Sequence, residues 1–151
     1  MPMRLRPVPS SSVTDHQLVE ERLTHSIIGA FYDVYNALGF GFLEQVYMAA
    51  LERELRARGH DVGREVYVSV RYKGEEISRQ RIDMVVDQRV LVEAKSSQNL
   101  HKSASRQVYN YLRATRLEVG LLLHFGPEPA FYRLVQSHNV GRASRTKGRS
   151  G

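Results

Sequence analysis

Two charged side chains, Glu93 and Lys95, end an apolar run within the segment VDQRVLVEAKSS, residues 86–97. A third charged group, Asp83, lies in the preceding segment RIDMVV. The residues Asp87–Gln88–Arg89 separate the two segments and have the composition of a turn. The pattern predicts two antiparallel strands joined by a short turn, with carboxylates and an ammonium on both strands.

The register of this hairpin decides which charged groups meet. With a three-residue turn the paired residue numbers sum to 176, so Asp83 lies opposite Glu93 and Arg81 opposite Lys95. Asp83, Glu93 and Lys95 then project from one face of the sheet. Opposed carboxylates repel each other, and a hard cation such as Mg²⁺ or Mn²⁺ would relieve this, leaving the lysine to orient or deprotonate a water. The alternative is a solvent-facing strand on which Arg81 and Lys95 neutralise the acids.

A third carboxylate comes from a helix expected over about residues 42–58. On a helical wheel Glu44 falls within the apolar arc, which is formed by Leu43, Val46, Tyr47, Ala50, Leu51 and Leu55. Buried carboxylates are rare unless they are paired or bind a metal, so Glu44 is a candidate ligand. Two alternatives stay open, because Glu54 also projects near this arc and a glutamate in the first turn is also favourable as a capping or dipole residue.

A later helix, expected over about Lys102 to Thr115, has two functional faces. One is a basic stripe suited to phosphate contact, with Tyr109 in its middle and the cations Lys102, Arg106, Arg113 and Arg116 along it. Such a stripe also occurs on helices for solubility alone. Gln107 borders the opposite, sheet-facing side, where its amide either hydrogen-bonds the carboxylates or a metal-bound water, or simply marks the boundary of the helix.

The other elements follow from hydrophobic periodicity. Apolar residues recur at helical spacing from about Gln17 to Leu38. A hairpin with its turn at Lys73–Gly74 follows the second helix, and the strands VGLLLHF and AFYRLVQ follow the third. The resulting order ααβββαββ predicts an α/β fold, with helices flanking one mixed β-sheet.

Composition limits the class of protein. The 151 residues suit one domain, expected over residues 16–137, with a flexible arm at 1–15 and a basic flexible tail at 138–151. The net charge of +6 comes from residues 1–14 and 138–151, which either hold polyanions weakly or only aid solubility. The absence of cysteine excludes disulfides and thiolate metal sites and fits a cytoplasmic protein. No apolar stretch is long enough to span a membrane, so no membrane partner is expected.

The segment GFLEQVY, residues 41–47, has the pattern Gly-x-x-Glu-x-x-Tyr, and RIDMVV, VEAK, RQVYNYL and VGLLLHFG follow it in order. Over roughly Leu23 to Arg133 these segments resemble the GxxExxY family of the PD-(D/E)XK nuclease superfamily. The resemblance implies a restriction-endonuclease-like core. It also implies roles for particular residues: Glu44 as the helix carboxylate, Asp83 and Glu93 as metal ligands, Lys95 as the catalytic lysine and Gln107 as the active-site helix glutamine, with Tyr111 matching the tyrosine after it.

The chain departs from this family at one position. A histidine often stands three residues before the glutamine, and Ala104 occupies that position here. His101 lies one turn earlier and need not reach the same place. A role for that histidine is therefore not carried over.

The favoured function is a metal-dependent nuclease that hydrolyses phosphodiester bonds of nucleic acid, with DNA favoured over RNA. Mg²⁺ or Mn²⁺ would be held by Asp83, Glu93, Glu44 and the backbone carbonyl of Ala94. Backbone contacts to the substrate are expected from Lys102, Arg106, Tyr109 and Arg113. The alternative is a non-catalytic module on a nuclease fold that binds nucleic acid or a partner. A homodimer would suit cleavage of both strands of a duplex, although no residue identifies its interface.

Overall fold

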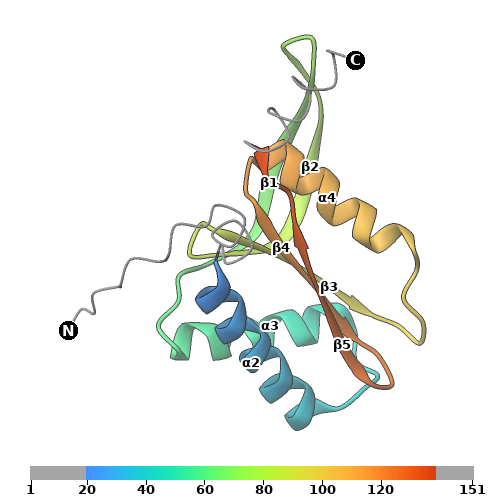
Figure 1. The fold of residues 1–151 in the computed structure, drawn as a ribbon. Coiled ribbons are helices and arrows are strands. Elements are labelled where there is room, and N and C mark those ends of the chain that lie inside the picture. The colour runs from blue at the N-terminus through green and yellow to red at the C-terminus, as the bar shows by residue number, and fades with distance from the viewer. Residues whose placement is uncertain (1–19, 139–151) are drawn as a thin grey trace, which may run out of the picture.

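The computed structural model describes residues 20–138 (Figure 1). Eight elements follow one another in the expected order: α2 (Glu21–Leu38), α3 (Glu44–Ala57), β1 (Val62–Tyr72), β2 (Glu75–Val86), β3 (Val90–Ser96), α4 (Ser103–Thr115), β4 (Val119–Phe125) and β5 (Pro129–Val135). The prediction ααβββαββ is therefore confirmed. The expected N-terminal arm, the expected helix start at Gln17 and the C-terminal tail beyond residue 138 lie outside the described residues.

The five strands form one mixed sheet in the order β1-β2-β3-β4-β5. Three neighbouring pairs are antiparallel, whereas β3 and β4 are parallel and α4 connects them. A parallel pair needs such a crossover, because the chain must return to the end of the sheet at which the first strand begins. The parallel pair is also the most buried part of the sheet, with every residue of β4 buried.

Helices cover both faces of the sheet. Helices α2 and α3 pack on one face against β3 and β4 side chains that include Val92, Leu121 and Phe125. Helix α4 covers the other face, where Leu91 and Leu122 contact it (Figure 1). Burial on both faces explains why the central strands read as continuous apolar runs rather than alternating ones.

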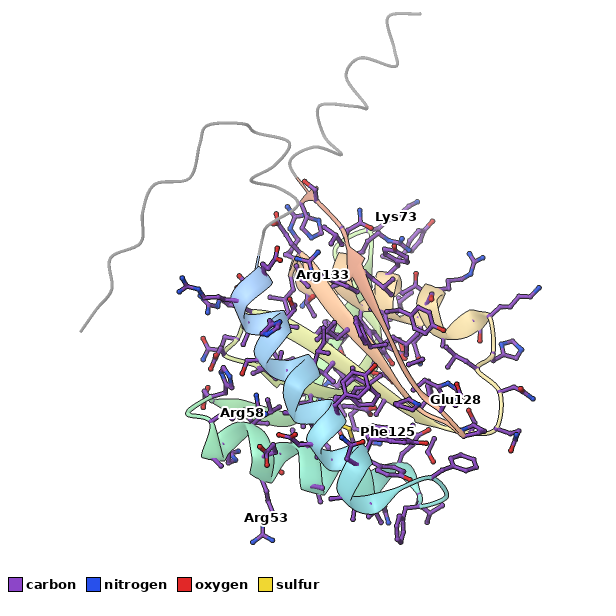
Figure 2. All side chains as sticks on the ribbon, turned by 60° about the horizontal axis from the view of Figure 1, so that its bottom comes forward. Arg53, Arg58, Lys73, Phe125, Glu128 and Arg133 are labelled. Atoms are coloured by element: carbon purple, nitrogen blue, oxygen red, sulfur yellow. The ribbon has the colours of Figure 1, made fainter. Side chains whose placement is uncertain are left out.

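Two close contacts fix the positions of the helices against the sheet. In Figure 2 Phe125 lies beside α2, where its ring is 4.9 Å from Phe31 and also stacks on Tyr47 at 4.1 Å, measured between centroids. On the other face, a Cβ added to Gly120 would lie 2.7 Å from a methyl carbon of Val108. Any side chain at position 120 would therefore push α4 away from the sheet.

The β1–β2 hairpin extends past the rest of the sheet (Figure 1). Strand β1 ends at Tyr72 and β2 begins at Glu75, so the predicted turn at Lys73–Gly74 is confirmed. Its inner half packs Val66 and Val68 against α4, while Tyr67 and Tyr72 are exposed. The hairpin thus forms one wall beside α4.

Near the C-terminal end of α3, a chain of hydrogen bonds joins three segments of the protein. Ser26 Oγ is 2.8 Å from His60 Nε2, and His60 Nδ1 is 2.8 Å from Asp87 Oδ2. Asp87 also accepts the Asp61 backbone N–H at 2.7 Å. Burial alone would raise the pKa of Asp87, but the hydrogen bonds from Asp61 and His60 outweigh it and lower the pKa. This carboxylate therefore stabilises the fold at neutral pH, and the contribution is lost as the pH falls through its lowered pKa.

We expect Asp87→Ala to lower the free energy of unfolding by about 1–3 kcal/mol at pH 7, because it leaves His60 and the Asp61 N–H without their acceptor. Urea unfolding at pH 7 measures the loss. Asp87→Asn, which keeps one acceptor oxygen, should lose less. Equal stability of Asp87→Ala and the unchanged protein would contradict this role.

Candidate active site

The site begins where strands β2 and β3 part. Their pairs Met84 with Val92, Val85 with Leu91 and Val86 with Val90 have the predicted register. The ladder stops there, one pair before Asp83 and Glu93. Asp83 Oδ2 accepts the Ala94 backbone N–H at 3.2 Å, so a side chain takes the place of the next ladder hydrogen bonds. The two acids lie near each other as predicted, but at a fork between strands rather than as a regular cross-strand pair.

The predicted pair of Arg81 and Lys95 does not form. Strand β3 pairs along its whole length with β4, which puts Lys95 beside His124. Strand β2 stays with β1, so Arg81 is opposite Tyr67, and its guanidinium lies 3.8 Å from Glu65. The salt-bridge alternative, in which Arg81 neutralises the acids together with Lys95, loses one of its two cations.

Glu93 is the most unusual group at the fork. It is 5% exposed, and its Oε1 has no hydrogen-bond partner among residues 20–138. Burial, together with the charge of Asp83 and to a smaller extent that of Glu44, raises the pKa of Glu93 to about 8, although the Lys95 ammonium offsets part of the rise. The Lys95 ammonium is 3.9 Å from the other oxygen of Glu93, which is a long ion pair. A carboxylate so placed needs either a proton or a cation.

Glu44 reaches the same region from the first turn of α3. Its Oε2 accepts the Ser96 backbone N–H at 3.2 Å, at the end of β3. The residue is exposed, so the expected burial within the apolar arc is wrong. The buried residues of α3 are Tyr47, Met48, Leu51 and Leu55. Glu44 lies on the same stripe as these residues but one turn before it, where the helix extends past the core.

Two other members of the expected arc are also outside the core. Leu43 is 70% exposed and Val46 38% exposed. The buried stripe is therefore rotated by about one residue from the predicted arc. The tertiary packing explains this rotation, because Met48 and not Val46 lies on the side of α3 that packs against α2 and β3.

The loop before Glu44 is held by the first and last members of the Gly-x-x-Glu-x-x-Tyr pattern. The buried Tyr47 hydroxyl donates to the Gly39 carbonyl and accepts the Phe42 N–H at 3.2 Å. Gly41 has a φ of 120°, a conformation that other residues rarely adopt. The pattern therefore has a structural meaning, since Gly41 permits the bend, Tyr47 fixes the loop and Glu44 is presented to β3.

Helix α4 supplies the opposite side of the site. Gln107 Nε2 donates to the Tyr111 hydroxyl at 3.2 Å, and that hydroxyl donates to the Arg81 carbonyl at 3.4 Å. Burial raises the pKa of Tyr111, followed by the charges of Glu93 and Asp83. Gln107 and Tyr111 therefore lie on the sheet-facing side of α4 and close to the acids, as the sequence predicts.

A cleft of about 1120 Å³ opens over this region between α4 and the β1–β2 hairpin. Glu44, Lys95 and Gln107 are part of its lining. The lining has one acidic residue, Glu44, against four lysines and arginines: Arg71, Lys95, Arg106 and Arg113. The cleft is therefore basic at its walls, and its lining residue Lys95 connects it to the buried Glu93, 3.9 Å away.

The predicted basic stripe divides between two surfaces. Arg106 and Arg113 line the cleft, whereas Lys102 and Tyr109 do not. Tyr109 is partly buried against the core under α4, and Lys102 lines a separate shallow hollow. The structure thus brings two of these four residues to the site.

One buried group near the site, His124, was not found from the sequence. His124 is 8% exposed, and its Nε2 is 3.0 Å from the Ser97 carbonyl, so it holds the segment after Lys95. A histidine within the apolar run VGLLLHF was the available signal. His101 has a different position, because its Nδ1 accepts the Ser103 N–H at 3.0 Å and caps the start of α4.

Comparison with protein families gives a match to the model described as the PD-(D/E)XK nuclease superfamily, over residues 21–134. The chain belongs to this superfamily. The match spans the elements from α2 to β5, and the five-stranded mixed sheet flanked by helices is the restriction-endonuclease-like fold of that superfamily. PD-(D/E)XK nucleases generally use divalent metals.

A solved structure described as "Crystal structure of SSO0001" has the same fold, with a TM-score of 0.51 and 19% sequence identity. The alignment covers 87% of this chain and 66% of that one, just under two thirds of its length. At this identity the likeness shows the fold alone. A search of curated proteins finds no match. Within residues 20–138 no helix is long and apolar enough to cross a membrane.

The acids of this PD-(D/E)XK site suit a hard cation by their chemistry. Glu93 Oε1 has no hydrogen-bond donor among the described residues, and the pKa of Glu93 is raised. The carboxylates here therefore lie together with too few hydrogen-bond donors to satisfy them. Oxygen ligands of this kind are those that Mg²⁺ and Mn²⁺ prefer. In the described part of the chain, however, no three Asp, Glu or His side chains already stand as a ligand set.

Proposed function

We propose that this protein is a nuclease that hydrolyses phosphodiester bonds with Mg²⁺ or Mn²⁺, acting on DNA rather than RNA. One observation carries the proposal: Glu93 is buried next to Lys95, which lines a basic cleft, and it has a pKa raised to about 8 and an oxygen without a hydrogen-bond partner among residues 20–138. Such a strained carboxylate is costly to the fold and is typical of functional sites. The interlocked Gly41, Glu44 and Tyr47 also support assignment to the GxxExxY branch of the superfamily.

Asp83 and Glu93 would hold the metal, with Glu44 completing the set from α3. The Ala94 carbonyl would join them, because a strand residue points its N–H and C=O to the same side and the Ala94 N–H points to Asp83. The bound ion would neutralise charge that develops on the phosphate. At neutral pH its binding would displace the proton that Glu93 otherwise holds.

Lys95 and Gln107 line the cleft on facing elements, β3 and α4. The Lys95 ammonium would orient the attacking water against the phosphate, since it is the cation nearest to Glu93 in the cleft. Gln107, held by Tyr111, would orient that water or the lysine. Arg106 and Arg113 would bind the phosphates that flank the scissile bond.

One observation favours the competing function, a non-catalytic binding module. The 3.9 Å contact between Lys95 and Glu93 is an ion pair that can satisfy part of the site without metal. In such a module the acids would be structural, and the basic cleft would bind nucleic acid without cutting it. The two functions differ in whether cleavage depends on Asp83.

The test is a cleavage assay with labelled single-stranded, duplex and branched DNA and with RNA, in Mg²⁺ and in Mn²⁺. We expect cleavage of DNA that EDTA stops and that falls at least 100-fold in Asp83→Asn, which keeps an acceptor for the Ala94 N–H. Glu75→Gln, which removes a carboxylate at the exposed tip of the hairpin, serves as the matched control. Cleavage that survives Asp83→Asn would rule out this site, and binding of DNA without cleavage would identify the module.

A further inference from the structure

The segment that leads into α3 exposes large apolar side chains. Phe40 is 43%, Phe42 46%, Leu43 70% and Val46 38% exposed. These four residues, which we call the apolar rim, lie within seven positions of the chain and include Phe42 and Leu43 next to Glu44. Single exposed apolar residues are ordinary on a protein surface, but a contiguous set usually marks a site of interaction.

The loop that carries the apolar rim is firmly held. The Gly39 N–H donates to the Tyr35 carbonyl at 2.8 Å, and the Ser96 hydroxyl donates to the Phe42 carbonyl at 2.6 Å. The Tyr47 hydroxyl bonds the backbone at both Gly39 and Phe42. The aromatic side chains are therefore presented to solvent by a fixed backbone, so a ligand that contacts them would not have to order the loop.

The apolar rim is continuous with the basic cleft. Phe40, Phe42 and Leu43 line a second hollow of about 480 Å³, together with Glu44, Ser96 and Ser97. Glu44 and Ser97 also line the basic cleft, so the two hollows meet at the candidate metal ligand Glu44. A ligand that fills both must carry negative charge on one part and flat apolar groups on another.

We propose that the apolar rim stacks unpaired bases of a single-stranded nucleic acid whose phosphates lie in the basic cleft, with Phe40 and Phe42 as the stacking residues. This inference rests on the proposed function and names its substrate class. A base within a duplex has its faces covered by its neighbours, so an exposed phenyl ring can stack only on an unpaired or terminal base. The four cations of the cleft match the phosphate backbone, which a protein partner would not supply.

Binding is measured without cleavage, by fluorescence anisotropy in EDTA. The probes are a labelled oligo-dT of about 12 nucleotides, within the usual site size for such proteins, and a blunt duplex of the same length. Because one stacked base contributes about 1–3 kcal/mol, we expect Phe40→Ala and Phe42→Ala each to weaken oligo-dT binding about 5- to 150-fold, with little change for the duplex. Phe40→Tyr, which keeps an aromatic face, should retain binding.

Tyr132→Ala is the matched control, because Tyr132 is 43% exposed on β5 and lines neither hollow.

Phe40→Ala is the decisive variant, and its melting temperature shows whether the fold is intact. Unchanged oligo-dT binding by folded Phe40→Ala would overturn the inference even if the protein cleaves DNA. If Phe40→Ala loses a dimer in sedimentation and still binds oligo-dT as the unchanged protein does, the inference is also overturned. That result would identify the apolar rim as an interface between two copies. Weakened binding in a protein that cuts nothing would support stacking and refute only the nuclease.

Discussion

In metal-free buffer, Glu93→Gln is expected to be more stable than the unchanged protein, and increasingly so as the pH rises. The folded-state pKa of Glu93 is raised from 4.5 to about 8, so folding opposes ionisation of this carboxyl. The resulting cost is absent below pH 4.5 and grows by about 1.4 kcal/mol per pH unit until the pH reaches about 8. Glutamine has nearly the same shape and carries no charge, so the variant avoids this cost.

Thermal or urea unfolding of both proteins in EDTA at several values between pH 5 and pH 9 measures the difference. The stability gap should be small at pH 5 and reach on the order of several kcal/mol at pH 9, discounted for relaxation around the buried charge. Glu52→Gln is a suitable control, because hydrogen bonds from Arg56 and Arg64 outweigh burial and lower the pKa of Glu52. A gap that does not change with pH would contradict the buried, protonated state of Glu93.

Lys95→Ala is expected to lower kcat for DNA cleavage about 10²- to 10⁴-fold at saturating metal, because it removes the group that positions the attacking water. The metal must be saturating because Lys95 also lowers the pKa of Glu93. Without Lys95, Glu93 holds its proton more tightly, and the metal has to displace that proton. Single-turnover cleavage of a labelled oligonucleotide separates this effect from product release.

Lys73→Ala provides the control for loss of one positive charge, because Lys73 lies at the exposed tip of the β1–β2 hairpin. It should leave kcat unchanged. Substrate affinity should change much less than kcat in Lys95→Ala, because Arg106 and Arg113 still line the cleft. If Lys95→Ala keeps more than a tenth of the activity, the lysine has no part in the chemistry.

The sequence was sufficient to predict the order of elements and the register of the β2–β3 hairpin. The hairpin follows from alternation and a short turn, both of which are local, so the observed pairs from Met84 to Val86 match the arithmetic. The fork at Asp83 could not be predicted in this way. It arises because β3 continues along β4, a pairing across the α4 crossover, while β2 continues along β1, and no local pattern says at which residue the two strands part.

The placement of Glu44 shows a second limit. Helical spacing correctly puts it on the stripe of Tyr47, Met48 and Leu51, but periodicity does not say where the core ends. Likewise, the basic stripe on α4 gave no means of separating Arg106 and Arg113 from Lys102 and Tyr109, since the position of the β1–β2 hairpin decides which side of α4 lines the cleft. Local pattern selected the right residue types, and the tertiary arrangement decided which of them share a site.

Calorimetric titration of Mn²⁺ or Mg²⁺ at pH 7, in two buffers of different ionisation enthalpy, tests the central claim most directly. The unchanged protein should bind the ion at one site formed with Asp83 and Glu93 and release about one proton, because Glu93 holds a proton at this pH. Glu93→Gln should show no such site. Absence of binding to the unchanged protein, or equal binding by Glu93→Gln, would contradict a metal-dependent nuclease at this position.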